Sequence, residues 1–431
     1  MMFINVNDEN FQENFDELLG RGKMDMAHVS GIVGGIIEEI KTQKNGALKK
    51  HIAKFDNWSP QTDADLKIST DSMSKAYESI DPKLRDALHL AYDRIRVYHE
   101  KQKPKSWFDT EENGTILGQK VTAVDSAGLY IPGGKAAYPS SLLMNVIPAQ
   151  VAGVEKIIIC TPTPDNEPNE LLLAACHLCG VTEVYKVGGA SAIAAMAYGT
   201  ETIPKVDVIT GPGNIFVATA KKMVFGEVNI DMIAGPSEIG VLADDSANAN
   251  HIAIDLLSQA EHDEMASSIL ITPSQKLADE VKIEIENWLV KLPRQEIARK
   301  SIEERGAIIV TKDMDEAVNL MNQIAPEHLE VATLSPFELL ASIKHAGAIF
   351  LGHFTPEAIG DYVAGPNHTL PTGGTAKFYS PLGVENFMKK SSIIAFSKKG
   401  INEIGKECAL IANTEGLTAH EQSVRVRLTD V

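Results

Sequence analysis

The segment Val206-Asp207-Val208-Ile209-Thr210 runs into Gly211-Pro212-Gly213-Asn214, and an apolar helical pattern follows at residues 215–223. A short run of β-branched residues that ends at glycine and precedes a helix is typical of a parallel α/β sheet. The same order of strand and helix begins at residues 156–160 and again at 184–187. These units predict an α/β domain with a parallel sheet.

The same alternation resumes later in the chain. A helix is expected from Asn248 to about Ser267. After it, strands are expected at 268–272, 306–310, 329–332 and 346–351, and helices at 275–289 and 314–324. Two α/β units of similar content predict duplicated domains. Residues 1 to about 105 are expected to be mostly helical, and the charged segment beyond about Pro381 is expected to be a helical tail.

The composition narrows the classes of partner. The chain has 431 residues, with 40 Lys and Arg against 58 Asp and Glu, so its formal net charge is −18. Such an acidic chain argues against a nucleic-acid or anionic-membrane partner. The first residues do not resemble a signal peptide, and no apolar run reaches the ~18 residues of a membrane span. A soluble, cytoplasmic protein is therefore expected.

Two of the four cysteines, Cys176 and Cys179, form a C-x-x-C pair. No second pair of this kind completes a zinc site. Both residues share one face of a helical pattern with Leu172. We interpret them as buried structural cysteines rather than as redox or metal-binding residues.

Four segments carry the candidate chemistry. In the first, Gln259 and His262 are three residues apart, so they project from the same side of the expected helix. Alone, this pair is typical of a solvated helix face. The other three segments place His near Glu or Asp, beside residues common in loops. They are Pro326-Glu327-His328, Gly360-Asp361-Tyr362 with Asn367-His368, and Glu415 with Ala419-His420-Glu421.

A metal site built from Gln259, His262, Asp361 and His420 would offer two imidazole nitrogens and two oxygens. Imidazole nitrogens suit zinc, cobalt or nickel. A carboxamide oxygen is a harder ligand, so manganese also remains a candidate metal. The absence of an H-E-x-x-H motif weakens a metallopeptidase interpretation. The alternative, that these are unrelated polar residues, remains open on composition alone.

Glu327 and His328 are candidates for proton transfer. An imidazole near its ordinary pKa suits acid–base chemistry at neutral pH, and an adjacent carboxylate can orient water or hold the imidazolium. The alternative is an ordinary helix start, with Pro326 in its first turn.

A dinucleotide site is also open to two interpretations. Gly211-Pro212-Gly213 lacks the third glycine of a G-x-G-x-x-G motif. A glycine-opened helix could still hold a dinucleotide, or the turn could be an ordinary β-to-α connection.

Taken together, these segments resemble the histidinol dehydrogenase family, from about Val29 to His420. Many long motifs occur in one order, which makes the likeness specific. They are residues 128–139, 188–190 with 192–200, 211–214, 231–238, 257–263, 325–330, 360–368 and 415–420.

The resemblance implies an α/β fold with two incomplete Rossmann-like parallel-sheet domains, a helical N-terminal region and a helical C-terminal tail. The implied division is an N-terminal segment at 1–20, a first domain at 21–128 with 238–380, a second domain at 129–237 with the NAD site, and a tail at 381–431. It also implies a homodimer in which each tail reaches the partner subunit.

The resemblance implies oxidation of L-histidinol to L-histidine with two NAD and one Zn²⁺ per subunit, with Mn²⁺ and Co²⁺ as alternatives. The implied zinc ligands are Gln259, His262, Asp361 and His420, and the acid–base pair is Glu327 and His328. The residues expected at the substrate are Ser237, Gln259, His262, His328, Asp361, His368, Glu415 and His420. Those expected at NAD are Tyr130, Ser191 and Asn214.

Ser191 departs from the family, which usually has Gln at this position. A serine hydroxyl can cap the helix or bond a phosphate, but it has a shorter reach. Three rival functions remain for experiment to separate: a related zinc and NAD dehydrogenase of another primary alcohol, a zinc hydrolase, and a non-catalytic zinc-stabilised scaffold.

Overall fold

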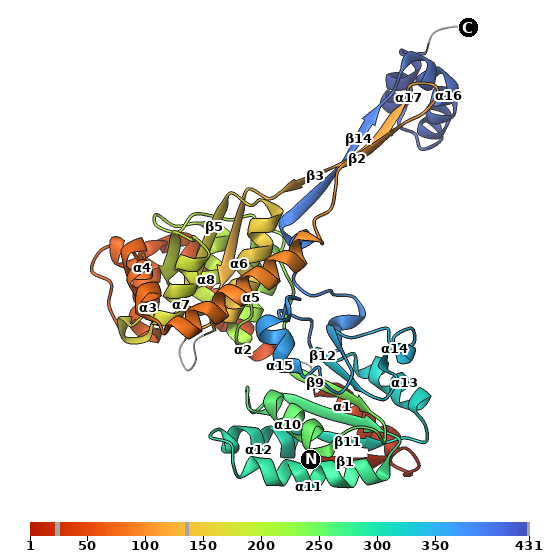
Figure 1. The fold of residues 1–431 in the computed structure, drawn as a ribbon. Helices are drawn as coiled ribbons and strands as arrows, with labels where there is room; N and C mark the ends of the chain where they lie inside the picture. Colours follow the sequence, from red (N-terminus) through yellow and green to blue (C-terminus); the bar gives the residue numbers. More distant parts are fainter. Residues whose placement is uncertain (22–25, 134–137, 429–431) are drawn as a thin grey trace. The chain divides into compact units, whose positions relative to one another are not determined.

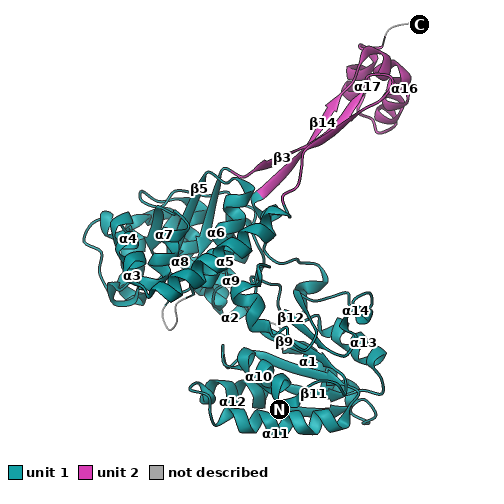
Figure 2. Ribbon diagram, in the orientation of Figure 1, with its two compact units in different colours: residues 1–102, 125–387 teal, residues 103–124, 388–431 magenta. Residues whose placement is uncertain are grey.

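The computed structural model describes residues 1–21, 26–133 and 138–428. The chain folds into two compact units, coloured separately in Figure 2. Unit 1 comprises residues 1–102 and 125–387, and unit 2 comprises 103–124 and 388–431. The chain therefore enters unit 2 twice, once through a short central insertion and once through its C-terminal segment.

Unit 1 contains a six-stranded parallel sheet in the order β1-β11-β10-β9-β12-β13 (Figure 1). Its strands are β1 (Met2–Asn5), β9 (Glu238–Ala243), β10 (Ser267–Thr272), β11 (Ala307–Val310), β12 (His328–Ala332) and β13 (Ala348–Leu351). Its helices are α1 (Phe11–Gly20), α10 (Ala249–Ala260), α11 (Gln275–Leu289), α12 (Gln295–Arg305), α13 (Met314–Ile324) and α14 (Pro336–Leu339). The central strand β9, an apolar run from Ile239 to Ala243, was not predicted from the sequence.

Unit 1 also contains a five-stranded parallel sheet in the order β6-β5-β4-β7-β8. Its strands are β4 (Ser126–Tyr130), β5 (Lys156–Thr161), β6 (Glu183–Lys186), β7 (Val208–Thr210) and β8 (Asn229–Ile230). Its helices are α6 (Pro139–Ala152), α7 (Glu170–Leu178), α8 (Gly189–Tyr198) and α9 (Ile215–Val224).

The five-stranded sheet has the 3-2-1-4-5 order of a Rossmann sheet without its sixth strand, with β4 as strand 1. The six-stranded sheet has the same order with β9 as strand 1, and β1 is added beside β11. The prediction of two incomplete Rossmann-like domains is therefore confirmed. Cys176 and Cys179 are free and buried, as predicted, and burial raises the pKa of Cys176 to about 12.

The N-terminal helices pack on the five-stranded half of unit 1. They are α2 (Ala27–Gln43), α3 (Asn45–Phe55), α4 (Thr70–Ser79) and α5 (Pro82–Glu100). Helix α2 packs on α8 and α9, and its Val33 and Ile37 share a buried core with Ile193. The resemblance implies a first domain of 21–128 with 238–380, and this division stays a prediction. An amphipathic pattern shows that a helix buries one face, but it does not show which sheet that face contacts.

Unit 2 is a three-stranded antiparallel sheet with two helices. Its strands are β2 (Trp107–Thr110), β3 (Ile116–Ala123) and β14 (Met388–Ala395), and its helices are α16 (Lys398–Thr414) and α17 (Thr418–Arg425). The predicted helical tail is thus correct for α16 and α17 but wrong for residues 388–395, which pair with β3. Among the described residues, no helix is long and apolar enough to cross a membrane.

Candidate functional site

The candidate site begins where two neighbouring strands of the six-stranded sheet start. Glu238 is the first residue of β9 and His328 is the first residue of β12, and the two strands are parallel partners. First residues of parallel neighbours meet at the amino edge of a sheet. Glu327 is the residue just before β12, and its Oε2 accepts the Glu238 N–H at 2.9 Å. The sequence interpretation of Pro326-Glu327-His328 as a possible helix start is therefore wrong.

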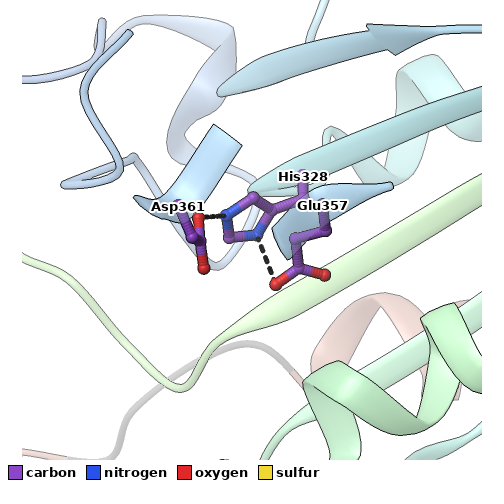
Figure 3. Close-up of side chains that lie close together, drawn as sticks. All are labelled: His328, Glu357 and Asp361. Atoms are coloured by element: carbon purple, nitrogen blue, oxygen red, sulfur yellow. Dashed lines mark hydrogen bonds and ion pairs between the residues drawn. The ribbon is translucent and has the colours of Figure 1, made fainter. Parts of the chain in front are cut away.

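The His328 ring lies between two carboxylates (Figure 3). Its Nε2 is 3.3 Å from Oδ1 of Asp361, and its Nδ1 is 3.7 Å from Oε1 of Glu357. The same Nδ1 is 3.2 Å from the carbonyl oxygen of Glu238. A carbonyl oxygen can only accept, so this contact requires a proton on Nδ1, whereas the Gln259 Nε2 amide, 3.3 Å from the same Nδ1, can only donate and requires a lone pair there.

Burial and charge shift the pKa of every member of this cluster. Burial disfavours the charged form of His328, but Glu357, Glu327 and Asp361 outweigh this effect and raise its pKa well above the ordinary value. Burial raises the pKa of Glu327 to about 7 and that of Glu238 and of Glu357 to about 8. The pKa of Asp361 is lowered, since the bond and charge of His328 exceed its desolvation. The cluster can therefore hold and move protons near neutral pH.

Gln259 and His262 come from the end of α10. The helix ends at Ala260 rather than near the predicted Ser267, because a turn follows in which the Asp263 carboxylate accepts the Met265 N–H at 2.9 Å. Gln259 is buried, and its Nε2 is 3.3 Å from Nδ1 of His328. The Oε1 atom of Gln259 therefore remains available as a metal ligand. His262 is exposed in the turn, and its Nδ1 donates to the Ser258 carbonyl at 2.9 Å.

These residues fit a zinc ion by their chemistry. The hydrogen bond from Nδ1 of His262 to the Ser258 carbonyl places the ring proton on Nδ1 and leaves a lone pair on Nε2. This is the tautomer that binds a metal through Nε2. Asp361 is the carboxylate of the set, and His262 contributes to lowering its pKa. Gln259 supplies an amide oxygen. Three of the four predicted ligands thus offer one nitrogen and two oxygens, which zinc accepts.

A second candidate metal group overlaps this set at Asp361. Ligand-type atoms of His328, Glu357 and Asp361 lie within 4.8 Å of one another. Both His328 ring nitrogens face oxygen acceptors, however, and Nδ1 also faces the Gln259 amide donor, so hydrogen bonds within the protein already engage the ring. A metal-bound imidazole must instead present a lone pair. The geometry therefore favours a hydrogen-bonded acid–base cluster for this group.

The residues predicted to contact substrate lie in three places. Ser237 directly precedes β9, and the Nδ1 of His368 is 2.9 Å from the Asp361 carbonyl oxygen. Asp361 and His368 line a cavity of about 980 Å³. Glu415 and His420 are exposed residues of unit 2, and their role stays a prediction.

The predicted NAD residues surround one cavity at the carboxyl edge of the five-stranded sheet. Tyr130, Ser191 and Asn214 all line this cavity of about 610 Å³. The Tyr130 hydroxyl accepts the N–H of Gly189, the first residue of α8, at 3.1 Å. Gly211 has φ +114°, and a Cβ there would lie 2.0 Å from the Tyr130 carbonyl oxygen, so only glycine fits this turn. The crevice at the carboxyl ends of strands 1 and 4 is where Rossmann sheets bind dinucleotides, so the cavity fits NAD.

Sequence reasoning missed three residues of these sites. Glu238 and Glu357 join the acid–base cluster, and His51 lies behind Ser191, with Nδ1 2.8 Å from the serine Oγ. The far ring nitrogen of His51 is 3.0 Å from Glu39. Glu238 ended one of the quoted motifs, and Glu357 precedes Asp361 at helical spacing, so both left a weak signal. The position of His51 depends on tertiary packing.

A family model described as histidinol dehydrogenase matches residues 19–428. The chain belongs to the histidinol dehydrogenase family. It is 80% identical to the histidinol dehydrogenase of Sulfurimonas denitrificans, over 99% of this chain and 100% of the relative. It is 69% identical to that of Wolinella succinogenes, over 97% of each chain.

Structural comparison agrees with this family. The crystal structure of histidinol dehydrogenase from Elizabethkingia anophelis matches with a TM-score of 0.93 and 36% identity, over 99% of this chain and 98% of that one. The resemblance inferred from the motifs is thereby confirmed. The chain is an NAD-dependent oxidoreductase of this family.

Proposed function

We propose that the protein oxidises L-histidinol to L-histidine, the last steps of histidine biosynthesis, in two successive two-electron steps through histidinaldehyde. Each turnover would use two NAD, with one Zn²⁺ per subunit. One observation carries the proposal: a chain 80% identical to a histidinol dehydrogenase has a buried Glu327-His328 pair in contact with Gln259 and Asp361.

The metal would be held by Gln259, His262 and Asp361, together with His420 of the partner subunit. Mn²⁺ and Co²⁺ are alternatives to Zn²⁺. The bound ion would attract the amine and imidazole nitrogens of histidinol and so orient the substrate. Ser237, His368 and Glu415 of the partner subunit would contact the same substrate.

The first oxidation requires a base for the alcohol proton as hydride leaves the carbinol carbon. His328 takes this role because its ring lies at the centre of the cluster. A base needs a lone pair, so when both ring nitrogens carry protons the ring must first pass one to a neighbouring carboxylate. Glu357 and Glu327, at 3.7 and 3.8 Å from Nδ1, are placed to receive it.

The second oxidation requires water to add to the aldehyde. Glu327 accepts a proton from that water. Its Oε2 is held by the Glu238 N–H, which leaves Oε1 as the acceptor for the water. A second NAD would then accept the hydride that the hydrate loses.

The stoichiometry of a coupled assay tests the proposal. Purified enzyme supplied with zinc, histidinol and excess NAD should form two NADH for each histidinol consumed, with histidine as the product. An ester or amide substrate should give no reaction. One NADH per substrate with accumulating aldehyde would contradict the four-electron scheme, and equal rates with other primary alcohols would favour a related dehydrogenase of different specificity.

A further inference from the structure

The cavity at the five-stranded sheet contains a buried carboxylate that the reaction scheme does not use. Asp56 follows the last residue of α3 and lines this cavity together with Tyr130, Ser191 and Asn214. Its side chain is only 7% exposed. Burial raises the pKa of Asp56, and the Thr163 backbone N–H opposes this shift. A buried carboxylate of this kind needs hydrogen-bond donors.

The place of Asp56 in the fold indicates which donors it would meet. In the 3-2-1-4-5 order, β5 is strand 2 of the five-stranded sheet. In Rossmann sheets that bind NAD, an acidic side chain near the end of strand 2 bonds the hydroxyls of the adenosine ribose. Here β5 ends at Thr161 and is followed by Pro162-Thr163-Pro164-Asp165, in which Asp165 is exposed and does not line the cavity.

Asp56 supplies a carboxylate at that same place from outside the sheet. Its carbonyl oxygen accepts the Asp165 N–H at 2.7 Å, which ties the end of α3 to the loop after β5. The Thr163 N–H lies against its side chain. Pro162 and Pro164, on either side of Thr163, also line the cavity. The N-terminal helical region thus completes the nucleotide site of the five-stranded sheet.

We propose that the Asp56 carboxylate accepts hydrogen bonds from the adenosine ribose hydroxyls and selects NAD over NADP. This inference rests on the proposed binding of NAD in this cavity. A 2′-phosphate would replace a hydroxyl donor by negative charge beside a buried carboxylate, which is strongly unfavourable. Lys54 also lines the cavity, but its ammonium lies 5.1 Å above the Phe55 ring, and the residue is exposed to solvent.

The test compares Asp56→Asn with the unchanged enzyme. We expect the variant to raise KM for NAD roughly tenfold and to lower the NAD-to-NADP ratio of kcat/KM by at least about tenfold, because an ion-assisted hydrogen bond and a repulsion are both lost. The KM for histidinol should not change. Asp165→Asn is the matched control, since it removes one charge from an exposed carboxylate that does not line this cavity.

Binding measurements give a readout that does not depend on turnover. Calorimetry with ADP-ribose and its 2′-phosphate should show strong preference for ADP-ribose in the unchanged enzyme and weak preference in Asp56→Asn. If that variant does not fold, 2′-deoxy-NAD provides the test, since it should bind the unchanged enzyme roughly tenfold more weakly than NAD. Equal binding of NAD and 2′-deoxy-NAD, or an unchanged preference in the variant, would overturn the role of Asp56. Failure of the unchanged enzyme to reduce NAD with histidinol would instead overturn the proposed function.

Discussion

The two sheets of unit 1 have the same strand order but offer opposite edges for chemistry. In the five-stranded sheet, Tyr130 ends β4 and Asn214 follows β7, so the cavity lies at the carboxyl edge. In the six-stranded sheet, Glu238 and His328 begin β9 and β12, so the acid–base cluster lies at the amino edge. Strand order alone therefore predicts only one of the two sites.

Local hydrogen bonds account for this difference. At the carboxyl edge of the six-stranded sheet, the Asp244 carboxylate accepts the N–H of Ser246 at 2.9 Å and that of Leu334 at 3.0 Å. These bonds join the turns that follow β9 and β12. In the five-stranded sheet, Gly211 after β7 lies against the end of β4, and Tyr130 and Asn214 line the cavity instead. A Rossmann-like sheet whose switch point is closed in this way can place its reactive groups at the other edge.

The largest effect at the amino edge is expected from Glu327→Gln. The first oxidation needs only a proton acceptor for the alcohol, whereas the second needs a base for the attacking water, which a neutral amide cannot provide. General-base assistance is worth roughly 10²–10⁴-fold, so oxidation of histidinaldehyde should fall by about that factor and oxidation of the alcohol far less. Stopped-flow NADH formation from each substrate measures this. Equal losses on both substrates would show that another group activates the water.

Subunit mixing tests whether the amino-edge site is completed by a second chain. His262→Asn and His420→Asn should each lose metal and activity, because an imidazole ligand is replaced by a weaker donor. After subunit exchange, a heterodimer carries both lesions in one site and neither in the other. A 1:1 mixture should therefore regain about a quarter of the unchanged activity in a two-fold symmetric dimer. No recovery after proven exchange would mean that one chain builds the whole site.

At the carboxyl edge, Ser191→Ala should affect cofactor binding rather than chemistry. If His51 donates its far N–H to Glu39, its Nδ1 accepts the serine hydroxyl, which leaves the serine oxygen to accept from the cofactor. Loss of one such bond should raise KM for NAD by roughly 3–10-fold, with kcat and KM for histidinol nearly unchanged. Steady-state kinetics with both substrates decide this. A fall in kcat with an unchanged KM for NAD would contradict a role of Ser191 in cofactor binding alone.

The sequence predicted local elements better than long-range partners. Helices α11 and α13 have the predicted bounds because their apolar residues repeat at helical spacing. Strand β14 was missed, since its only ladder is with β3, far earlier in the chain. Likewise, Glu327 and His328 were predicted, but the contact with Glu238 depends on the pairing of β12 with β9, and the contact with Glu357 depends on the segment after β13, the other neighbour of β12. No local pattern encodes these pairings. The residues predicted to bind NAD came from the family resemblance, whereas His51 lies in α3 and Asp56 directly follows this helix, so their positions depend on tertiary packing.

The smallest expected effect is a change in the pH dependence of folding stability in Glu238→Gln, a substitution at the amino edge of the six-stranded sheet. The Glu238 carboxyl is buried at the amino edge, and its Oε2 accepts the Gly373 N–H at 3.0 Å. Burial, together with the charge of Glu327, raises the pKa of Glu238 from 4.5 to about 8. Between these two values the folded chain keeps a proton that the unfolded chain has released. Folding stability from this group is therefore complete below pH 4.5 and is lost as the pH rises towards 8.

A glutamine cannot ionise, and its side-chain oxygen can still accept the Gly373 N–H. Any cost of burying the extra amide donors does not vary with pH. We therefore expect the melting temperature of Glu238→Gln to rise relative to the unchanged enzyme between pH 5 and 8, by an amount equivalent to at most a few kcal/mol at pH 8. Thermal unfolding of the zinc-supplied enzyme across this range measures the difference, with Glu155→Gln at an exposed position as the control. Parallel curves for Glu238→Gln and the unchanged enzyme would show that Glu238 ionises as readily in the folded chain as in the unfolded one, and that the amino edge does not store a proton there.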